Sequence, residues 1–353
     1  MGRELKFYQA IHEALDISLA KDPSVYVMGL GVPDPKGFFG TTLALQEKFG
    51  SSRVMDMPTS ENGMTGVAIG SALVGMRPVL AHQRVDFAIL SMEQIANQAA
   101  KWHYMFGGKM AVPLVIRLII GRGWGQGPQH SQSLQSWFAH IPGLKVVMPT
   151  TPSDAKGLLI SSIEDNNPVI FMEHRWLYNL SAEVPEGIYR VPLGKARIMR
   201  QGSDVTLVAV SHMVIEALRA ADLLSRQGIE VEVIDVRTLR PLDKDSILAS
   251  VKKTGRLLVV DTSWEMCGFS AEVVAMVAER SMADLKCSPR RLGLPDCPTP
   301  TSPALAEHYY PLAKDIAKLA WQMIQGVSVP APLWDGASSE PMDVPDLSFK
   351  GPF

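Results

Sequence analysis

The sequence predicts an α/β protein of two domains, each with a mostly parallel sheet covered by helices on both faces. Short runs rich in Val, Ile and Leu, such as 168–174 and 204–211, alternate with longer amphipathic segments. Apolar strands separated by helices are typical of parallel sheets that are buried on both sides. The chain has 353 residues, which is enough for two hydrophobic cores of ordinary size.

The first domain is expected to span residues 1–178 and to begin with an amphipathic helix. Its expected strands are 24–30, 77–82, 113–119, 144–150 and 168–174, and the helices between them begin near Ser60, Ser91 and Ser153. Asp154 is expected to cap the last of these helices and to place a negative charge in its first turn.

A linker rich in Pro and Gly is expected at residues 179–202, before a second domain at 203–325. The second domain is expected to contain strands 204–211, 229–236 and 256–262 and helices 212–227, 243–253, 269–283 and 303–325. Residues 326–353 are rich in Pro, Ser and Gly and have no period, which predicts an arm or a disordered end.

Composition excludes several classes of function. Lys plus Arg (34) nearly equals Asp plus Glu (36), which gives no electrostatic case for binding nucleic acid or an anionic membrane. Three cysteines without a paired metal spacing favour a reducing compartment. The strongest apolar run is interrupted by Arg117 and is too short to cross a bilayer. Without a signal peptide at the start, these features predict a cytoplasmic protein.

Glu61 lies at the start of a helix of small and apolar residues that extends to Val74. Burying a carboxylate in such surroundings is costly unless a partner is present. One interpretation is a carboxylate that stabilises the helix start, with Ser60 as the cap. The other is a carboxyl group in an apolar pocket that shares its proton with a ligand nitrogen.

His130 follows a loop with four glycines, GRGWGQG. Such a loop lets the backbone approach a ligand closely, and a histidine after it has access to solvent and substrate. The pattern alone is equally compatible with a catalytic histidine and with a histidine that has no catalytic role. It is not a phosphate loop, because neither GKS nor GKT follows and GxGxxG is absent.

Two other histidines belong to the same half of the chain. His82 ends a strand, where α/β sheets place ligand sites, although Arg84 and Asp86 beside it are explained as well by pairing with each other or with surface groups. His103 belongs to an aromatic and Met-containing stripe that is more typical of packing. The motifs GxSxG, HExxH and CxxC are absent, so hydrolase and zinc-enzyme functions have no support.

Several segments together resemble one known family. They are MPTSENGMTGVAIGSALVGMRPV, AAKWHYMFGG, PQHSQS, HIPGLKVVMPTTPSDAKGLL, EDNNPVIFMEH and VIDVRTLRPLD. The chain resembles the beta subunits of thiamine-diphosphate-dependent 2-oxo acid dehydrogenases, the decarboxylating component of the pyruvate and branched-chain complexes, over residues 4–325. The resemblance implies a transketolase-like pyrimidine-binding domain followed by a transketolase C-terminal domain.

The resemblance also implies roles for individual residues. Glu61 matches the carboxylate that hydrogen-bonds the pyrimidine nitrogen of thiamine diphosphate and so promotes proton removal from the thiazolium ring. Phe87 matches the aromatic residue near the aminopyrimidine, and His130 matches the histidine that assists acyl transfer. The positions that match a structural potassium site of some members are Leu114, Ser162, Ile163, Asp165 and Asn167.

The GDG motif that normally holds the diphosphate and its Mg²⁺ is absent from this chain. Two phosphates and a metal need ligands, so the resemblance implies an alpha subunit that supplies them. We therefore expect an alpha2-beta2 heterotetramer, inactive as beta alone, with a lipoyl acyltransferase as a further partner.

The segment AHQRVDF departs from the largely apolar sequence that is usual in the family, and it places His82, Gln83 and Arg84 at the expected active-site entrance. Extra cationic and amide groups suit a polar or anionic substrate. Two alternatives therefore remain: half of a split transketolase or acyloin-forming carboligase with an aldehyde or sugar acceptor, and a non-catalytic scaffold. The presence of Glu61, Phe87 and His130 together argues against the scaffold.

Overall fold

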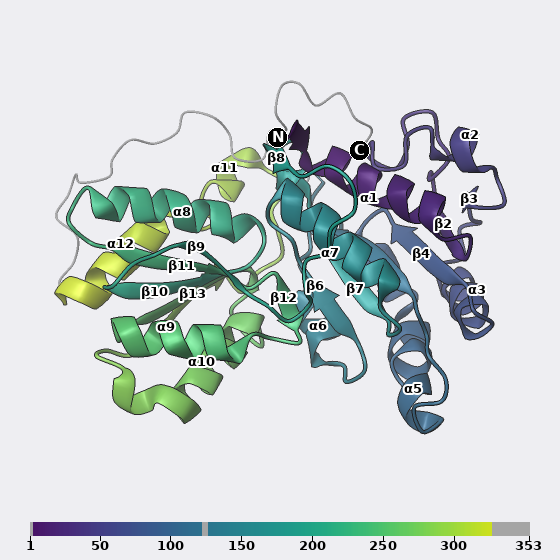
Figure 1. Cartoon of the computed structure of the whole chain (residues 1–353). Coiled ribbons are helices and arrows are strands. Elements are labelled where there is room, and N and C mark those ends of the chain that lie inside the picture. The colour runs from purple at the N-terminus through teal and green to yellow at the C-terminus, as the bar shows by residue number, and fades with distance from the viewer. Residues whose placement is uncertain (1–2, 122–125, 327–353) are drawn as a thin grey trace.

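The computed structural model describes residues 3–121 and 126–326, which form two lobes (Figure 1). A seven-stranded sheet forms the centre of the first lobe and a five-stranded sheet the centre of the second. Most neighbouring strands are parallel, and helices cover both faces. The expected class of two parallel-sheet α/β domains is confirmed.

The first sheet has the strand order β12-β6-β7-β5-β4-β2-β3. Its parallel strands are β2 (Val25–Gly29), β3 (Val54–Met55), β4 (Arg77–His82), β5 (Val115–Ile120), β6 (Lys145–Val147) and β7 (Val169–His174). The three central strands β4, β5 and β7 are almost fully buried, as their continuous apolar sequences predict. Because these strands are parallel, their carboxyl ends meet at one edge of the sheet.

Two helical layers enclose this sheet. On one face lie α1 (Phe7–Lys21), α2 (Leu45–Phe49) and α7 (Pro152–Glu164), whose apolar residues share a core with Val79 and Ala81 of β4. On the other lie α3 (Glu61–Leu73), a π-helix (Gln94–Ala99) and α6 (Gln135–His140), with the short helices α4 (Val85–Ile89) and α5 (Trp102–Met105) nearby.

The cap of α7 differs from the expectation. Thr151 occupies the N-cap position, and its side chain accepts a hydrogen bond of 3.0 Å from the backbone N–H of Asp154. The prediction of Asp154 as the cap was wrong, because Pro152 is already helical and the cap must precede it. Asp154 still places a negative charge in the first turn.

The second sheet has the order β14-β13-β10-β11-β9. Its strands are β9 (Arg197–Arg200), β10 (Val205–Ala209), β11 (Val231–Asp235), β13 (Leu257–Trp264) and β14 (Arg290–Leu294), of which β9 is antiparallel to its neighbour. Figure 1 shows α8 (His212–Ser225) and α12 (Ala313–Gln325) above this sheet, and α9 (Lys244–Thr254) and α10 (Phe269–Ser281) below it.

The helix expected over 303–325 forms as two helices, α11 (Pro303–Ala306) and α12. Pro311 lies between them, lacks an N–H and disfavours helical geometry in the residue before it. Short 3-10 turns occupy Arg175–Leu177 and Met282–Asp284. Within the two described stretches, no helix is long and apolar enough to cross a membrane.

Three short strands connect parts of the chain that the sequence places apart. β8 (Ser181–Val184), inside the expected linker, pairs antiparallel with β1 (Arg3–Lys6), inside the expected first helix. β12 (Thr238–Arg240), inside the expected second domain, pairs antiparallel with β6 at the edge of the first sheet. The second half of the chain therefore completes the sheet of the first half.

The two lobes also share apolar packing. One continuous cluster of buried residues contains Ile116 and Ile170 from the first sheet together with Val208 and Val236 from the second half. Across the same junction, Gln135 donates a 2.7 Å hydrogen bond to the Asp261 carboxylate. The lobes are thus joined by a core as well as by the covalent chain.

Asp235, the last residue of β11, leads to a testable pH dependence. Burial and the neighbouring Asp154 carboxylate raise its pKa to about 7, and its Oδ2 has no partner within the described residues. A folded-state pKa above the unfolded value means that the folded protein holds the proton more tightly. The stability that Asp235 contributes is therefore present below about pH 4 and is lost as pH rises through about 7.

We expect Asp235→Asn to remove this loss, because an amide does not ionise. The difference in the free energy of unfolding between the variant and the wild type should grow in favour of the variant between pH 4 and 7, by about 1.4 kcal/mol per pH unit at most. Urea unfolding at several pH values measures it. Parallel stability curves for the two proteins would contradict the assignment.

Candidate functional site

The candidate site lies at the carboxyl edge of the first sheet, where α/β folds hold their ligands. The loop after β2 is tied to two neighbouring segments there. The Gly31 N–H donates to the Asp56 carboxylate (3.1 Å), and the Gln83 amide donates to the Leu30 carbonyl (3.3 Å). The edge therefore brings together the segments that carry Glu61, His82 and Phe87, and β5 leads into the segment that carries His130.

Glu61 is the first residue of α3 and is only 5% exposed. Its backbone carbonyl accepts a hydrogen bond from the Thr65 hydroxyl (2.8 Å), but within residues 3–121 and 126–326 no group donates to its carboxylate. Ser60 occupies the cap position without making a side-chain capping bond, so the capping interpretation lacks its hydrogen bond. A buried glutamate whose carboxylate has no partner in the described residues suits a ligand that brings the partner with it.

His130 is held by two residues of α4. Its Nδ1 lies 2.8 Å from Oδ2 of Asp86, and its ring lies 5.5 Å from the Phe87 ring, tilted by 32°. The His130 side chain remains 41% exposed, whereas that of Asp86 is 13% exposed. The pair thus has the form of an accessible imidazole oriented by a carboxylate.

The entrance residues occupy different environments. Gln83 is exposed, whereas Arg84 is 3% exposed and its Nη1 donates to the carbonyls of Gly121 and His130, both at 2.9 Å. Burial, with a smaller effect of Arg175, lowers the pKa of Arg84 to about 10, so its guanidinium stays charged at neutral pH. The charge of Arg84 is therefore directed at the backbone of the loop that carries His130.

His82 is 1% exposed, and neither ring nitrogen has a hydrogen-bond partner in the described part of the chain. Burial lowers its pKa to about 4, so the ring is neutral at physiological pH. Its strand neighbour Leu80 belongs to the core shared with α3. Because side chains alternate along a strand, His82 lies on the same face of the sheet as the helix that Glu61 begins.

Sequence reasoning missed a second pair of rings behind this loop. His174, at the end of β7, stacks on His212, at the start of α8, with ring centroids 5.0 Å apart. Trp176 packs edge-on against both. Burial lowers the pKa of both histidines, that of His212 to about 4, so both are neutral at neutral pH. The stack joins the two lobes, and a histidine ending a buried strand was its only sequence signal.

Gly121 connects this stack to the loop. Its φ is +76°, and a Cβ there would lie 2.3 Å from Nε2 of His174. Gly121→Ala is therefore expected to lower the free energy of unfolding by about 1–2 kcal/mol for the backbone and about 1–3 kcal/mol more for the overlap. Gly228 is a matched control, with φ +74° and open space around it, so Gly228→Ala should show only the backbone cost. If urea unfolding shows that both variants lose the same free energy of unfolding, the predicted overlap with His174 is refuted.

The five positions expected to bind potassium lie just before β5 and at the end of α7. They are Leu114, Ser162, Ile163, Asp165 and Asn167. The carbonyl oxygens of Ile163 and Asp165 both accept hydrogen bonds from Nη1 of Arg77, at 3.0 and 3.1 Å. The Asp165 carboxylate pairs with Lys145. Among the described residues, no cluster of three His, Cys, Asp or Glu could hold a metal ion.

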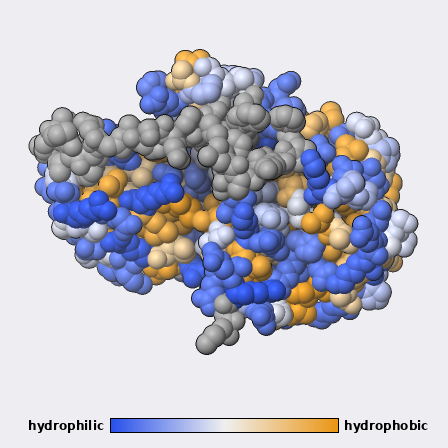
Figure 2. Space-filling model, turned by 90° about the horizontal axis from the view of Figure 1, so that it is seen from above, coloured by the Kyte–Doolittle hydropathy of each residue, from blue (hydrophilic) through white to orange (hydrophobic). Residues whose placement is uncertain are grey.

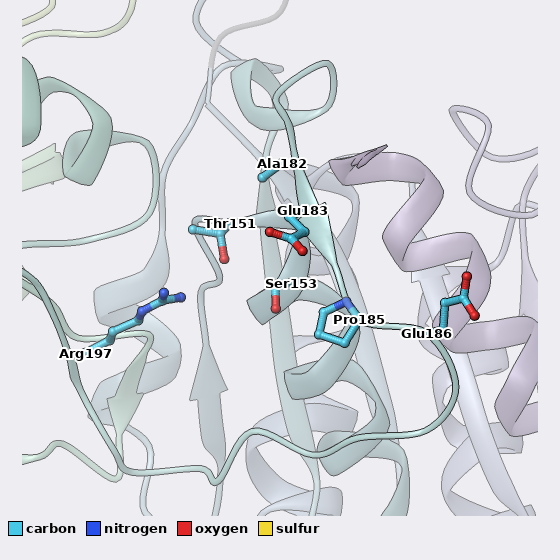
Figure 3. A pocket seen from close by; sticks show the side chains of 7 residues that line it. All are labelled: Thr151, Ser153, Ala182, Glu183, Pro185, Glu186 and Arg197. Carbon is cyan, nitrogen blue, oxygen red and sulfur yellow. The ribbon is translucent and has the colours of Figure 1, made fainter. Parts of the chain in front are cut away.

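A pocket of about 620 Å³ lies elsewhere on the molecule, between the start of α7 and the strands β8 and β9. Figure 3 shows its lining, with Arg197 directed toward Thr151 and Ser153. Arg197 also pairs with Asp154. None of the candidate residues lines this pocket, so it is not part of the site.

Comparisons with known proteins agree with this fold. Residues 3–181 match the transketolase pyrimidine-binding domain, and residues 194–316 match the transketolase C-terminal domain. A solved split-gene transketolase, described as an inactive beta4 tetramer, has the same fold, with a TM-score of 0.73 at 22% identity over 91% of this chain and 98% of that one.

Two curated relatives cover nearly the whole chain. The beta subunit of acetoin:2,6-dichlorophenolindophenol oxidoreductase from Cupriavidus necator is 46% identical, covering 92% of this chain and 99% of the relative. The beta subunit of the pyruvate dehydrogenase E1 component from Bacillus subtilis is 41% identical, covering 91% and 99%. The chain therefore belongs to the family of thiamine-diphosphate-dependent dehydrogenase beta subunits that includes these pyruvate and acetoin proteins.

Proposed function

We propose that this chain is the half of a decarboxylating enzyme that binds the pyrimidine ring of thiamine diphosphate and passes an acyl unit to an acceptor. The observation that carries the proposal is Glu61, a buried residue at the start of α3 whose carboxylate receives no hydrogen bond from the described residues. When bound, thiamine diphosphate supplies the electron sink for cleaving a carbon–carbon bond beside a carbonyl. Glu61 would hydrogen-bond the pyrimidine nitrogen and bias its protonation, and Phe87 would pack beside the ring.

Activity is proposed to require an alpha subunit. This chain has no GDG motif for the diphosphate and Mg²⁺, and both curated relatives described above are named as beta subunits. Large apolar side chains are exposed on α3, on α5 and after α4, which is typical of a surface that a partner covers. They are Val67, Leu90, Tyr104 and Met105. Figure 2 also shows apolar side chains exposed among hydrophilic ones on the upper face. We propose an alpha2-beta2 heterotetramer.

Potassium does not fit the residues expected to bind it. The carbonyl groups of Ile163 and Asp165 converge on the guanidinium of Arg77, and a potassium ion between them would lie beside that positive charge. No step is therefore assigned to potassium.

The acceptor has two candidates. A lipoyl domain carried by an acyltransferase is the acceptor that family resemblance favours. The other candidate is an aldehyde, which accepts the acyl unit to form an α-hydroxy ketone, or is released when an α-hydroxy ketone is cleaved in the reverse direction. The 46% identity to the acetoin protein favours this acyloin chemistry. Arg84 offers little charge to a substrate, because it donates to Gly121 and His130. Of the other two entrance residues, His82 is buried, so Gln83 remains as the exposed polar group for substrate selection.

The test is turnover by the complete complex. This chain would be co-expressed with an alpha-type subunit that carries GDG, preferably from a neighbouring gene, and purified with thiamine diphosphate and Mg²⁺. Pyruvate, branched 2-oxo acids and acetoin would be offered with 2,6-dichlorophenolindophenol, a lipoyl domain or an aldehyde as the acceptor. Turnover that needs both subunits supports the proposal, and the best acceptor decides between the candidates. A well-formed complex without turnover on any combination would favour a scaffold.

A further inference from the structure

The segment from Arg84 to Phe87 contacts His130 in three independent ways. Arg84 donates to its backbone carbonyl, Asp86 pairs with Nδ1 of its ring, and Phe87 packs beside the ring. Arg84 also donates to Gly121, so one guanidinium holds two points of the same loop. The N-cap and first turn of α4 thus hold the His130 backbone and orient its ring.

We propose that Asp86 is the positioning residue of His130, fixing the tautomer that leaves Nε2 free to take and return a proton at the active site. An ionised carboxylate only accepts hydrogen bonds, so Nδ1 of the neutral ring must carry the proton. The lone pair then lies on Nε2. When Nε2 takes a proton, the positive charge of the ring stays 2.8 Å from the Asp86 carboxylate.

Other roles account less well for Asp86. It belongs to the first turn of α4, where a negative charge is favourable, but α4 has only five residues and its N-cap makes no side-chain hydrogen bond. Its Oδ1 is buried without a partner, so within the described residues the Asp86 side chain makes its hydrogen bond to His130 alone. The Asp86 charge also counteracts the lowering of the Arg84 pKa by burial, but the side-chain hydrogen bond of Asp86 goes to the imidazole, which is the arrangement of an orienting group.

The experiment compares Asp86→Asn, His130→Gln and the double variant in the alpha–beta complex. The amide introduced by Asp86→Asn retains the shape but accepts less strongly and can also donate, so both tautomers become accessible. We expect kcat to fall by about 10- to 100-fold for Asp86→Asn with little change in KM. Because Asp86 acts through His130, the double variant should be no slower than His130→Gln alone. Glu93→Gln, an exposed carboxylate that bonds Gln94 and Gln98, is the matched control.

The kinetic comparison rests on the proposed function, because it needs an active complex. A second measurement does not depend on turnover and therefore tests the role of Asp86 separately. Nitrogen-15 NMR of histidine-labelled protein reports the tautomer, and the His130 signals are those lost in His130→Gln. We expect a protonated Nδ1 and an unprotonated Nε2 in the wild type, and a mixture in Asp86→Asn. An unchanged tautomer, or losses that multiply in the double variant, would overturn the proposal even if the complex is active. If the complex is inactive with every substrate, the proposed function is refuted. The His130 tautomer then decides by itself whether Asp86 positions the ring.

Discussion

Replacing Glu61 by Gln is expected to reduce decarboxylation by the complete complex by at least about 100-fold. Glutamine has the same shape but cannot hold or release the proton that the pyrimidine nitrogen requires, and positioned proton transfer contributes about 10²- to 10⁴-fold. The fold should survive, because Gln has the same shape as Glu and the substitution breaks no hydrogen bond from the described residues to the Glu61 carboxylate. Steady-state rates and thermal unfolding of the same preparations measure both effects.

The control for Glu61→Gln is again Glu93→Gln, which changes an exposed carboxylate just before the π-helix and should leave turnover unchanged. If Glu61→Gln retained more than about a tenth of the wild-type rate, Glu61 would not be the proton partner. A complex that no longer forms would point to a structural role at the start of α3.

Arg117→Met is expected to lower the free energy of unfolding by about 3–5 kcal/mol. Arg117 on β5 and Glu173 on β7 form a fully buried ion pair, with Nε–Oε1 at 2.6 Å and Nη2–Oε2 at 2.9 Å. Tyr178 donates to the same carboxylate (2.6 Å), and Thr41 accepts from the guanidinium (3.1 Å). Removing Arg117 leaves the Glu173 charge buried without its counter-ion.

Urea unfolding of Arg117→Met should be compared with Lys48→Met, which breaks the exposed pair with Asp16 and should cost less than about 1 kcal/mol. Replacing both Arg117 and Glu173 by apolar residues should recover much of the loss, because no uncompensated charge remains. Equal effects at the buried and exposed pairs would show that burial does not govern this interaction.

The parts of the fold that the sequence predicts well are those that local pattern determines. Strands β4, β5 and β7 are short apolar runs, and their observed bounds differ from the expected ones by at most two residues. β12 could not be predicted, because Thr238–Arg240 carries no strand pattern and gains its partner from the other lobe. The pairing of β8 with β1 likewise joins two segments that are far apart in the sequence and meet only in the fold.

The features of the site also divide into those that local sequence indicates and those that only the fold creates. Glu61 and His130 are marked by their surroundings in the sequence, a small-residue helix and a glycine-rich loop. The sequence does not reveal that Arg84 turns inward to Gly121 and His130, or that Asp86 reaches the imidazole. These contacts join residues more than thirty positions apart, so they exist only once β4 and β5 lie side by side.

Strand β12 has a consequence for the order in which the molecule is made. Among the strands that the first half of the chain contributes, β6 is outermost on one side of the sheet, and its outer edge pairs with Thr238–Arg240 of β12. Until the ribosome has added those residues, Lys145–Val147 presents free N–H and C=O groups that can recruit a strand from another chain. The pyrimidine-binding lobe is therefore finished only after much of its neighbour has been synthesised, and a shortened gene that stops in the linker would encode an aggregation-prone half.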